Sequence, residues 1–433
     1  MDDIQFYRIF TFPAVASIIT IVAITTQTLW SNFRNRFPEN VFKPSTFVCL
    51  VYIYYALIGP FYTIFTNDLT YRSVDMSPYY PISWVGAAVS LLFFKIATLI
   101  KWPPIGGKKL YDILPGKASK IAVALFCIGF AMYAAWMGSN IMVLLHGYQE
   151  GITFHNEGSF VMYLMQGVGF FAPVCCILLW CGIKQQKIKW WYFAIFALTL
   201  LIYINSGFRF RLVYFVISMA TVWYLTKGKK PSMVLWTGIA IGFLLFMGVM
   251  EETRSYEKGL DMSRAENLNS SDFLESGTNE ARVFMASGVA ISVTRQKENY
   301  AYLDPVLNAI LMPLPFAFFP EKREFSKYWG NRIESVFGIY GVGVAVLEYA
   351  EAYVAFGWLG VCFYGFFMGW LCKAIWNYYR RGPNKLFQIM TLAFFNGFIY
   401  VFISRGYLSQ IVVTAFFYVI IPLWFLKKLS ITR

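Results

Sequence analysis

Charged residues are scarce in this chain. They make up 14% of its 433 residues, whereas a soluble globular protein carries about 25%, so an ordinary soluble fold is excluded. Only two histidines are present, and the seven cysteines all lie within apolar runs, so neither a zinc-ligand spacing nor a disulfide framework emerges. The sequence also lacks a P-loop, which argues against an ATP-driven pump with its motor in this chain.

Apolar residues, in contrast, make up 58% of the chain. A run of about 20 apolar residues crosses a bilayer as a helix, and such runs predict an all-α, polytopic integral membrane protein with about 11 transmembrane helices. We place the spans near residues 9–30, 45–66, 79–100, 121–145, 159–182, 190–206, 211–226, 232–250, 343–371, 386–404 and 407–426. Residues 1–433 form one membrane domain, within which the polar stretch 251–342 is a single large loop.

Basic residues indicate the orientation of the chain. Of the 37 lysines and arginines, 21 lie in alternate connections that hold only two acids, Glu39 and Asp112. Because cytoplasmic loops are enriched in lysine and arginine, we expect these connections to be cytoplasmic, with the N-terminus outside, the C-terminus cytoplasmic and loop 251–342 facing outward. The net charge of +14 does not indicate nucleic-acid binding, since no soluble basic domain is present.

Three arginines stand at the outer ends of helices in this topology. Arg209 and Arg211 lie in a tight turn after residue 205, and Arg405 lies in the sequence Ser404-Arg-Gly-Tyr407. The planar guanidinium suits bidentate contact with phosphate oxygens, so the three arginines together predict a site for a pyrophosphate whose lipid tail stays in the bilayer. The alternatives are snorkelling of each arginine to lipid headgroups, or an error in the predicted topology around the two short spans 190–206 and 211–226.

Two glutamates, Glu348 and Glu351, begin the ninth predicted span. Their spacing of three places both carboxylates on one helical face, at the outer end of the span. Ionisable groups at membrane depth usually face a cavity or a partner, and a partly desolvated glutamate can act as a general base on a hydroxyl. The alternative is an ion pair with an outer arginine that only holds helices together.

The large loop contains two informative stretches. Residues 278–297 predict an amphipathic helix lying on the outer surface, and residues 302–322 are apolar but interrupted by four prolines, which favours a segment that dips against the membrane or caps a cavity. Arg282, Lys322 and Arg323 are candidate contacts for an acidic or sugar ligand, with solvated loop charge as the alternative.

No metal or cofactor is predicted. His146 and His155 share a short outer loop with two acids, but their spacing matches no ligand pattern. Asp68 and Asp75 flank Arg72 in another outer loop, where a paired-acid metal site for sugar-phosphate chemistry is the alternative to ordinary loop charge.

The order of these features resembles the Wzy-type polymerases of bacterial O-antigen and capsule repeat units. The chain has ten or more predicted spans and, late in its sequence, one large outer loop, and the resemblance covers roughly residues 200–410. The motifs that carry it are Gly207-Phe-Arg209-Phe-Arg211, Glu280-Ala-Arg282-Val, the proline-rich stretch from Leu314 to Lys322, Glu351-Ala-Tyr353-Val-Ala-Phe356-Gly357-Trp-Leu-Gly360, and Ser404-Arg405-Gly406.

The resemblance implies an all-helical membrane glycosyltransferase, similar in architecture to the GT-C class, in the bacterial inner membrane. It implies transfer of a growing glycan from undecaprenyl pyrophosphate to a second lipid-linked repeat unit, without a metal. Arg209, Arg211 and Arg405 would then bind the departing pyrophosphate, and Glu351 would orient or deprotonate the acceptor hydroxyl. Glu348, Tyr353, Arg282, Lys322 and Arg323 would contact the substrates. Membrane lipid, a chain-length regulator and a flippase are the partners implied.

Two other functions compete with this interpretation. An O-antigen ligase uses the same donor, but we expect a ligase to carry a histidine in its large outer loop, and residues 251–342 contain none. A lipid-linked oligosaccharide transporter or flippase would show ionisable residues in mid-span, whereas Lys95 is the one such residue here.

Overall fold

The protein is a bundle of long helices. The computed structural model describes residues 3–71, 73–102, 111–142, 163–232, 282–312, 345–383, 385–428 and 430–432, with short pieces between 238 and 253 and between 314 and 337. The helices are α1 (Asp3–Ile9), α2 (Phe12–Arg34), α3 (Pro44–Ile53), α4 (Gly59–Phe65), α5 (Tyr80–Leu99), α6 (Pro115–Met137), α9 (Phe171–Lys184), α10 (Trp190–Asn205), α11 (Arg209–Lys227), α14 (Arg282–Lys297), α15 (Asp304–Leu311), α17 (Ser335–Phe337), α18 (Glu348–Arg380), α19 (Leu386–Ser404), α20 (Leu408–Ala415) and α21 (Ile421–Lys428).

Short elements join these helices. The π-helical turns Tyr54–Ile58 and Phe416–Ile420 connect α3 to α4 and α20 to α21, so each pair forms one continuous rod. Strand β1 (Thr70–Tyr71) pairs antiparallel with β2 (Val74–Asp75), and β3 (Tyr111–Asp112) pairs antiparallel with β4 (Ile431–Thr432). Single 3₁₀ turns lie at Pro38–Phe42, Ser77–Tyr79, Gly138–Met142 and Gln166–Phe170.

Local sequence explains where several helices begin and end. Pro44 and Pro115 are the first residues of α3 and α6, a position where the missing N–H costs nothing and the fixed φ favours helix. Gly228 ends α11 with φ of 62°, the left-handed geometry that glycine adopts without a Cβ penalty.

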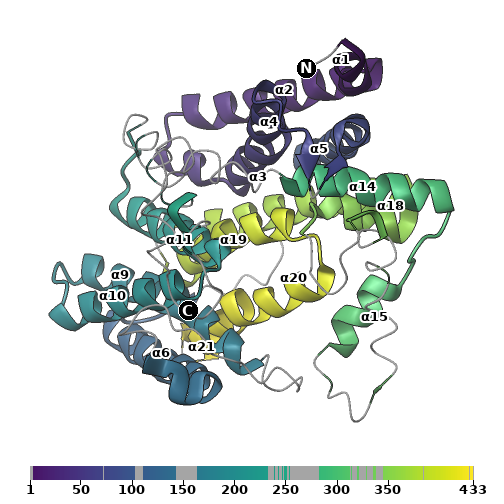
Figure 1. Cartoon of the computed structure of the whole chain (residues 1–433). Helices are drawn as coiled ribbons and strands as arrows, with labels where there is room; N and C mark the ends of the chain where they lie inside the picture. The colour runs from purple at the N-terminus through teal and green to yellow at the C-terminus, as the bar shows by residue number, and fades with distance from the viewer. Residues whose placement is uncertain are drawn as a thin grey trace.

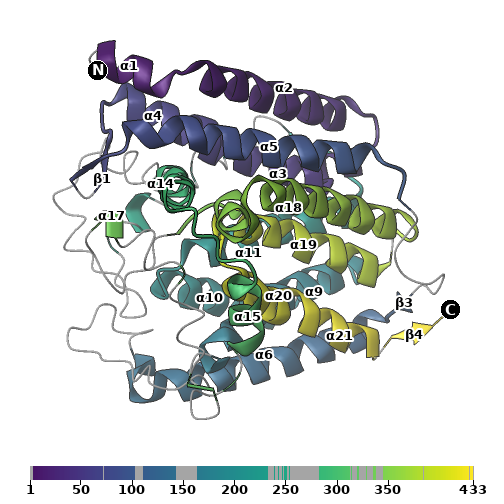
Figure 2. The same cartoon turned by 90° about the vertical axis from the view of Figure 1, so that its right-hand side faces the viewer.

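Eight helical stretches are long and apolar enough to cross a membrane. They are Phe12–Arg34, Pro44–Phe65, Ser77–Leu99, Pro115–Met137, Tyr163–Lys184, Glu348–Arg380, Leu386–Ser404 and Leu408–Lys428. Each coincides with one of the predicted spans, so the prediction of an all-α, polytopic membrane protein is confirmed. Figures 1 and 2 show these helices side by side, and in Figure 2 most of them run in nearly the same direction.

The other three predicted spans, 190–206, 211–226 and 232–250, are not among these eight stretches. Helix α10 is apolar but has only 16 residues, and α11 carries arginine at its start and lysine at its end. The prediction over 232–250 lies largely outside the described residues. The structure therefore supports eight of the predicted spans by length and composition, and the number 11 stays a prediction.

Contacts between connections support the predicted alternation of the chain. Lys230 donates a hydrogen bond to the Phe33 carbonyl, which joins the connection after α11 to the one after α2. Strands β3 and β4 join the connection after α5 to the C-terminal tail. The basic residues of these four segments predict that they lie on one side of the membrane, and the fold brings the two segments of each pair together.

Helix α19 lies at the centre of the bundle. In its apolar stretch 94% of the residues are buried, compared with 33% in α2 and α6. The exposed side chains of α2 include Phe12 and Trp30, as expected for a helix whose outer face meets lipid. Residues on α19 are therefore held by protein on all sides, and those on α2 are not.

Two glycines let α18 lie directly on α5. A Cβ at Gly365 would approach the Ser90 carbonyl oxygen to 2.2 Å, and one at Gly369 would approach the Phe94 carbonyl oxygen to 2.3 Å. Two small residues spaced four positions apart are the usual close-packing motif of membrane helices.

Helix α18 is kinked near its start. Phe356 has φ of −136° and ψ of 21°, and Gly357 has φ of 61° and ψ of −149°. The first two turns of α18, which carry both glutamates, therefore point in a different direction from the rest of the helix.

Replacing Gly357 by alanine is expected to lower the free energy of unfolding by about 1–3 kcal/mol, because its backbone conformation is essentially restricted to glycine. Thermal unfolding of the purified protein measures this effect. Gly116→Ala is the control, since an added Cβ there meets nothing within 4 Å. Equal midpoints for the two variants would contradict the account.

Helix α14 is more deeply packed than its sequence indicates. The predicted surface helix over 278–297 is present as Arg282–Lys297, but Phe284, Met285 and most of its middle residues are buried. It lies against α5 and α18. A Cβ at Gly288 would approach the Tyr79 carbonyl oxygen to 2.2 Å, so the helix touches the connection that precedes α5.

Candidate functional site

Arg209 and Arg211 are buried at the N-terminus of α11. Their exposed fractions are 4% and 1%, and Gly207, with φ of 70°, makes the turn that leads into the helix. The Arg211 guanidinium lies over the Phe208 ring, 4.5 Å from its centroid. Snorkelling to headgroups does not describe these side chains, because they are enclosed by protein. A helix N-terminus adds its own partial positive charge for an anion.

Helices α11 and α19 lie antiparallel, and their register brings Arg405 to the same end. The Ser218 hydroxyl donates to the Ala393 carbonyl at 3.0 Å, and Gly397 lies against Tyr214. Extending this register places the start of α11 beside the end of α19, where Arg405 is the half-buried residue directly after the helix. All three predicted arginines thus belong to one end of the bundle.

Glu351 lies at that end as well. Its two carboxylate oxygens accept the Leu408 N–H at 3.1 and 2.8 Å, and Oε1 accepts the Tyr328 hydroxyl at 2.7 Å. Leu408 is the first residue of α20 and follows Arg405 by three positions. The carboxylate therefore caps α20 and is held next to the arginine-bearing turn.

The same turn is fixed to the start of α18. The Gly406 N–H donates to the Val346 carbonyl at 2.7 Å, and the Leu347 N–H donates to the Ser287 hydroxyl of α14 at 2.8 Å. Because these bonds connect α14, α18 and the turn between α19 and α20, the position of Glu351 relative to Arg405 is set by backbone contacts.

The position of Glu348 in the sequence predicts a site at the outer end of the span. In the structure its side chain lies deeper in the bundle. It accepts the hydroxyls of Tyr52 and, at 3.3 Å, of Ser90, which lie near the middle of their spans. Its exposed fraction is 1%, and Oε2 has no hydrogen-bond partner among the described residues. The two glutamates share a turn of helix but reach different partners, so only Glu351 lies beside the arginine-bearing turn.

Tyr353, a predicted substrate contact, is 2% exposed and sits in an aromatic cluster beside the kink. Its ring centroid lies 4.9 Å from that of Trp358 and 6.2 Å from that of Tyr300. The N–H groups of Ala301 and Tyr302 donate to the carbonyls of Val354 and Ala355. Tyr353 thus packs the connection before α15 against α18.

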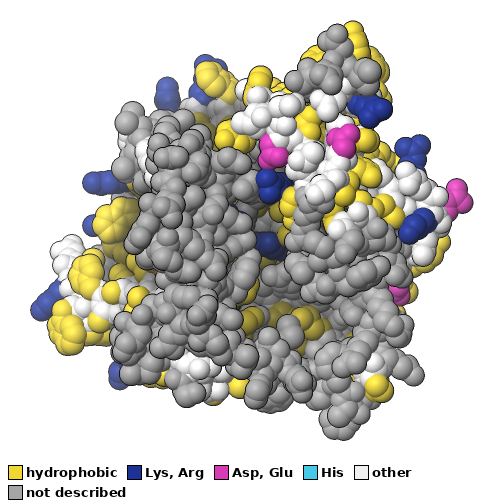
Figure 3. All heavy atoms as spheres, in the orientation of Figure 1, with side chains coloured by type: hydrophobic (Ala, Val, Ile, Leu, Met, Phe, Trp, Pro, Cys, Tyr) yellow, Lys and Arg dark blue, Asp and Glu magenta, His cyan; other side chains and the backbone are white. Residues whose placement is uncertain are grey.

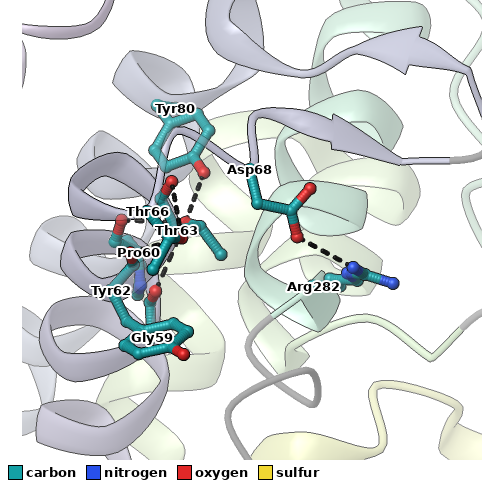
Figure 4. Close-up of polar contacts among 8 residues, drawn as sticks. All are labelled: Gly59, Pro60, Tyr62, Thr63, Thr66, Asp68, Tyr80 and Arg282. Atoms are coloured by element: carbon teal, nitrogen blue, oxygen red, sulfur yellow. Dashed lines mark hydrogen bonds and ion pairs between the residues drawn. The ribbon is translucent and has the colours of Figure 1, made fainter. Parts of the chain in front are cut away.

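Arg282 forms an ion pair with Asp68. The distance is 2.9 Å, and the two side chains are 29% and 31% exposed; Figure 4 shows how the pair joins α14 to the loop after α4. The guanidinium also lies 5.5 Å from the Tyr71 ring centroid. Asp75 binds the backbone and hydroxyl of Ser77, so the two acids of this loop serve different partners.

Replacing Arg282 by glutamine is expected to cost less than about 1 kcal/mol of stability, because the pair is partly exposed to solvent. A double-mutant cycle with Asp68→Asn measures the pair directly. Since the guanidinium is engaged by Asp68, we expect the activity of Arg282→Gln to stay close to that of the wild type. A large loss of activity with unchanged stability would instead give Arg282 a role toward substrate.

Other candidates lie outside the described residues. They are Lys322, Arg323, Glu280, His146 and His155. Within the described part of the chain, no three His, Cys, Asp or Glu side chains come together as metal ligands.

Sequence reasoning missed the partners of the two glutamates. Tyr328 lies in the large loop, and Tyr52 and Ser90 lie in ordinary apolar runs, so nothing in the sequence distinguished them.

In the view of Figure 3, basic side chains lie in a hollow near the middle of the face, with acidic side chains beside them.

Comparison with known proteins identifies a family for nearly the whole chain. A family model described as O-antigen polysaccharide polymerase Wzy matches residues 4–433. No curated protein and no solved structure gives a significant match.

Proposed function

The chain belongs to the O-antigen polysaccharide polymerase Wzy family, and we propose that it joins its repeat units at the end of the bundle that carries Arg209, Arg211, Arg405 and Glu351. Members of this family polymerise O-antigen repeat units, so the protein is a membrane glycosyltransferase that acts on lipid-linked oligosaccharides. The observation that carries the proposal is the convergence of three arginines and one buried carboxylate on the turns before α11 and α20.

In the proposed reaction, an acceptor hydroxyl of one repeat unit attacks the anomeric carbon of a glycan carried on undecaprenyl pyrophosphate. The new glycosidic C–O bond forms as the bond from that carbon to the pyrophosphate oxygen breaks, and the electron pair leaves with the pyrophosphate. The hydroxyl proton passes to Glu351. The Tyr328 hydroxyl, 2.7 Å from Oε1, marks where an O–H donor approaches this carboxylate.

The arginines would act on the leaving group. Guanidinium groups held in place before the reaction stabilise charge that develops on the pyrophosphate, and they do so more strongly where water is excluded. The burial of Arg209 and Arg211 supports this role. Their charges need no metal ion to neutralise the leaving group.

We propose that this end faces outward from the inner membrane, with the C-terminus in the cytoplasm. The support is the distribution of basic residues, because the connections rich in lysine and arginine gather at the opposite end. A chain-length regulator and a flippase remain proposed partners.

The test is reconstitution of the purified protein with undecaprenyl-pyrophosphate-linked repeat unit from its own host. We expect a ladder of glycan lengths on a gel, with and without chelator. Transfer to a lipid A core acceptor in place of a ladder would identify a ligase. Absence of both products from folded protein would overturn the proposal.

A further inference from the structure

A basic pocket lies at the end of the bundle opposite Glu351. It is formed by the ends of α2, α5 and α18 and the start of α3, and its volume is about 290 Å³. Hydroxyl and amide groups line it, together with four cationic side chains. The cations are Lys43, Lys95, Lys373 and Arg380. The α18 segment after the kink, Trp358–Arg380, spans about 35 Å, so this pocket is separate from the proposed polymerisation site.

The lysines are held in place by protein contacts. Lys95 Nζ donates to the Thr28 hydroxyl at 3.0 Å, and Lys373 Nζ donates to the Thr98 carbonyl at 3.0 Å. Lys43 Nζ lies 5.6 Å from the ring centroid of Trp376. Of the four cations, the three lysines are half-buried and Arg380, at the rim, is exposed.

Among the described lining residues, no carboxylate balances these charges. Among the described residues that line it, none is an acid, and Glu39, an acid of the connection after α2, is not one of them. Burial, with the charges of Lys373 and Arg380, lowers the pKa of Lys43. Like charges held together away from bulk water are costly unless an anion offsets them.

Neutral donors in the lining suit the same ligand. Asn32 is buried and binds the hydroxyls of Ser45 and Thr46 at 3.2 and 3.0 Å, which leaves the Ser45 hydroxyl proton available to the pocket. Ammonium, guanidinium and hydroxyl donors together are the groups that bind phosphate oxygens. The volume is enough for a headgroup or a small phosphate.

We propose that this pocket binds a phosphate group. The phosphate could belong to the headgroup of an anionic phospholipid in the adjoining leaflet, since basic pockets between membrane helices bind such headgroups. It could equally be a free phosphate ion, because the same cationic donors bind its oxygens. With the orientation proposed above, the pocket faces the cytoplasm.

The experiment uses the full chain purified in an uncharged detergent, with two probes. One probe is radiolabelled orthophosphate in equilibrium dialysis, and the other is dioctanoyl phosphatidylglycerol followed by native mass spectrometry. We expect saturable binding of one molecule per chain. Binding of only the lipid, or only the ion, identifies the source of the phosphate.

The pocket variant is Lys95→Met with Lys373→Met, and the control is Lys184→Met with Lys229→Met. The control removes the same charge from exposed positions outside the lining. We expect the pocket variant to lose about tenfold or more in affinity, as for loss of charge-assisted hydrogen bonds, and the control to change little.

A second variant, Arg380→Gln, changes an exposed rim residue that is not needed for packing, and we expect a smaller loss of affinity. It keeps the test decisive if the double variant fails to fold. Absence of saturable binding to both probes in the wild type, or equal losses in the pocket and control variants, would overturn the proposal.

Discussion

Replacing Glu351 by glutamine is expected to lower the rate of polymerisation by about 100-fold or more, the usual contribution of a positioned general base. Glutamine has nearly the same shape but cannot take the proton of the acceptor hydroxyl. Its amide can still accept the Leu408 N–H that Glu351 accepts, so the fold is expected to persist. The measurement is the initial rate of linkage formation by the reconstituted protein.

Glu298→Gln serves as the control for the lost charge, because Glu298 is exposed and follows α14. We expect this variant to polymerise like the wild type. If Glu351→Gln and Glu298→Gln are both active, Glu351 only caps α20.

Replacing Arg211 by glutamine is expected to lower the rate by about 100- to 1000-fold, the range found when one donor to a developing anion is removed. Arg211→Lys is expected to fall between this variant and the wild type, because lysine keeps the charge but loses the planar fork. Arg211 is 1% exposed, so the thermal midpoint is measured alongside the rate.

Lys227→Gln removes a basic residue from the opposite end of the same helix, and we expect it to leave the rate unchanged. A comparable loss in this control would mean that net charge, and not the position of Arg211, determines activity. Full activity of both Arg211 variants would remove Arg211 from the site.

The spans that could be predicted are those set by local composition. Crossing a bilayer needs about 20 apolar residues, and this requirement alone located all eight helical stretches now seen, including Leu386–Ser404 and Leu408–Lys428. Helix α10 is apolar enough to cross a bilayer but, at 16 residues, is shorter than the length required, because the turn at Ser206 and Gly207 ends it.

The candidate site was predictable only in part. Arg209, Arg211 and Arg405 were visible because basic residues are unexpected on the acidic side of the topology. The depth of Glu348 was not predictable, because helical periodicity assumes a straight helix and the backbone reverses its path at Phe356 and Gly357. The burial of α14 was not predictable for a different reason. Its many small residues lower its mean hydropathy but allow close packing against α5.

Lys95 shows how tertiary structure changes the interpretation of one residue. In the sequence it is an isolated charge inside a span. In the structure its ammonium group reaches Thr28 and a pocket shared with Lys373, so the charge has a polar environment at the end of the bundle.

The most direct test of the proposed site is the amount of undecaprenyl pyrophosphate released per glycosidic linkage, measured for the wild type and for Glu351→Gln. The account predicts one molecule released per linkage in the wild type, and in the variant a fall of about 100-fold or more in the rates of both release and linkage while lipid-linked donor still binds. A ladder formed by Glu351→Gln at the wild-type rate, or release without linkage in the wild type, would contradict it.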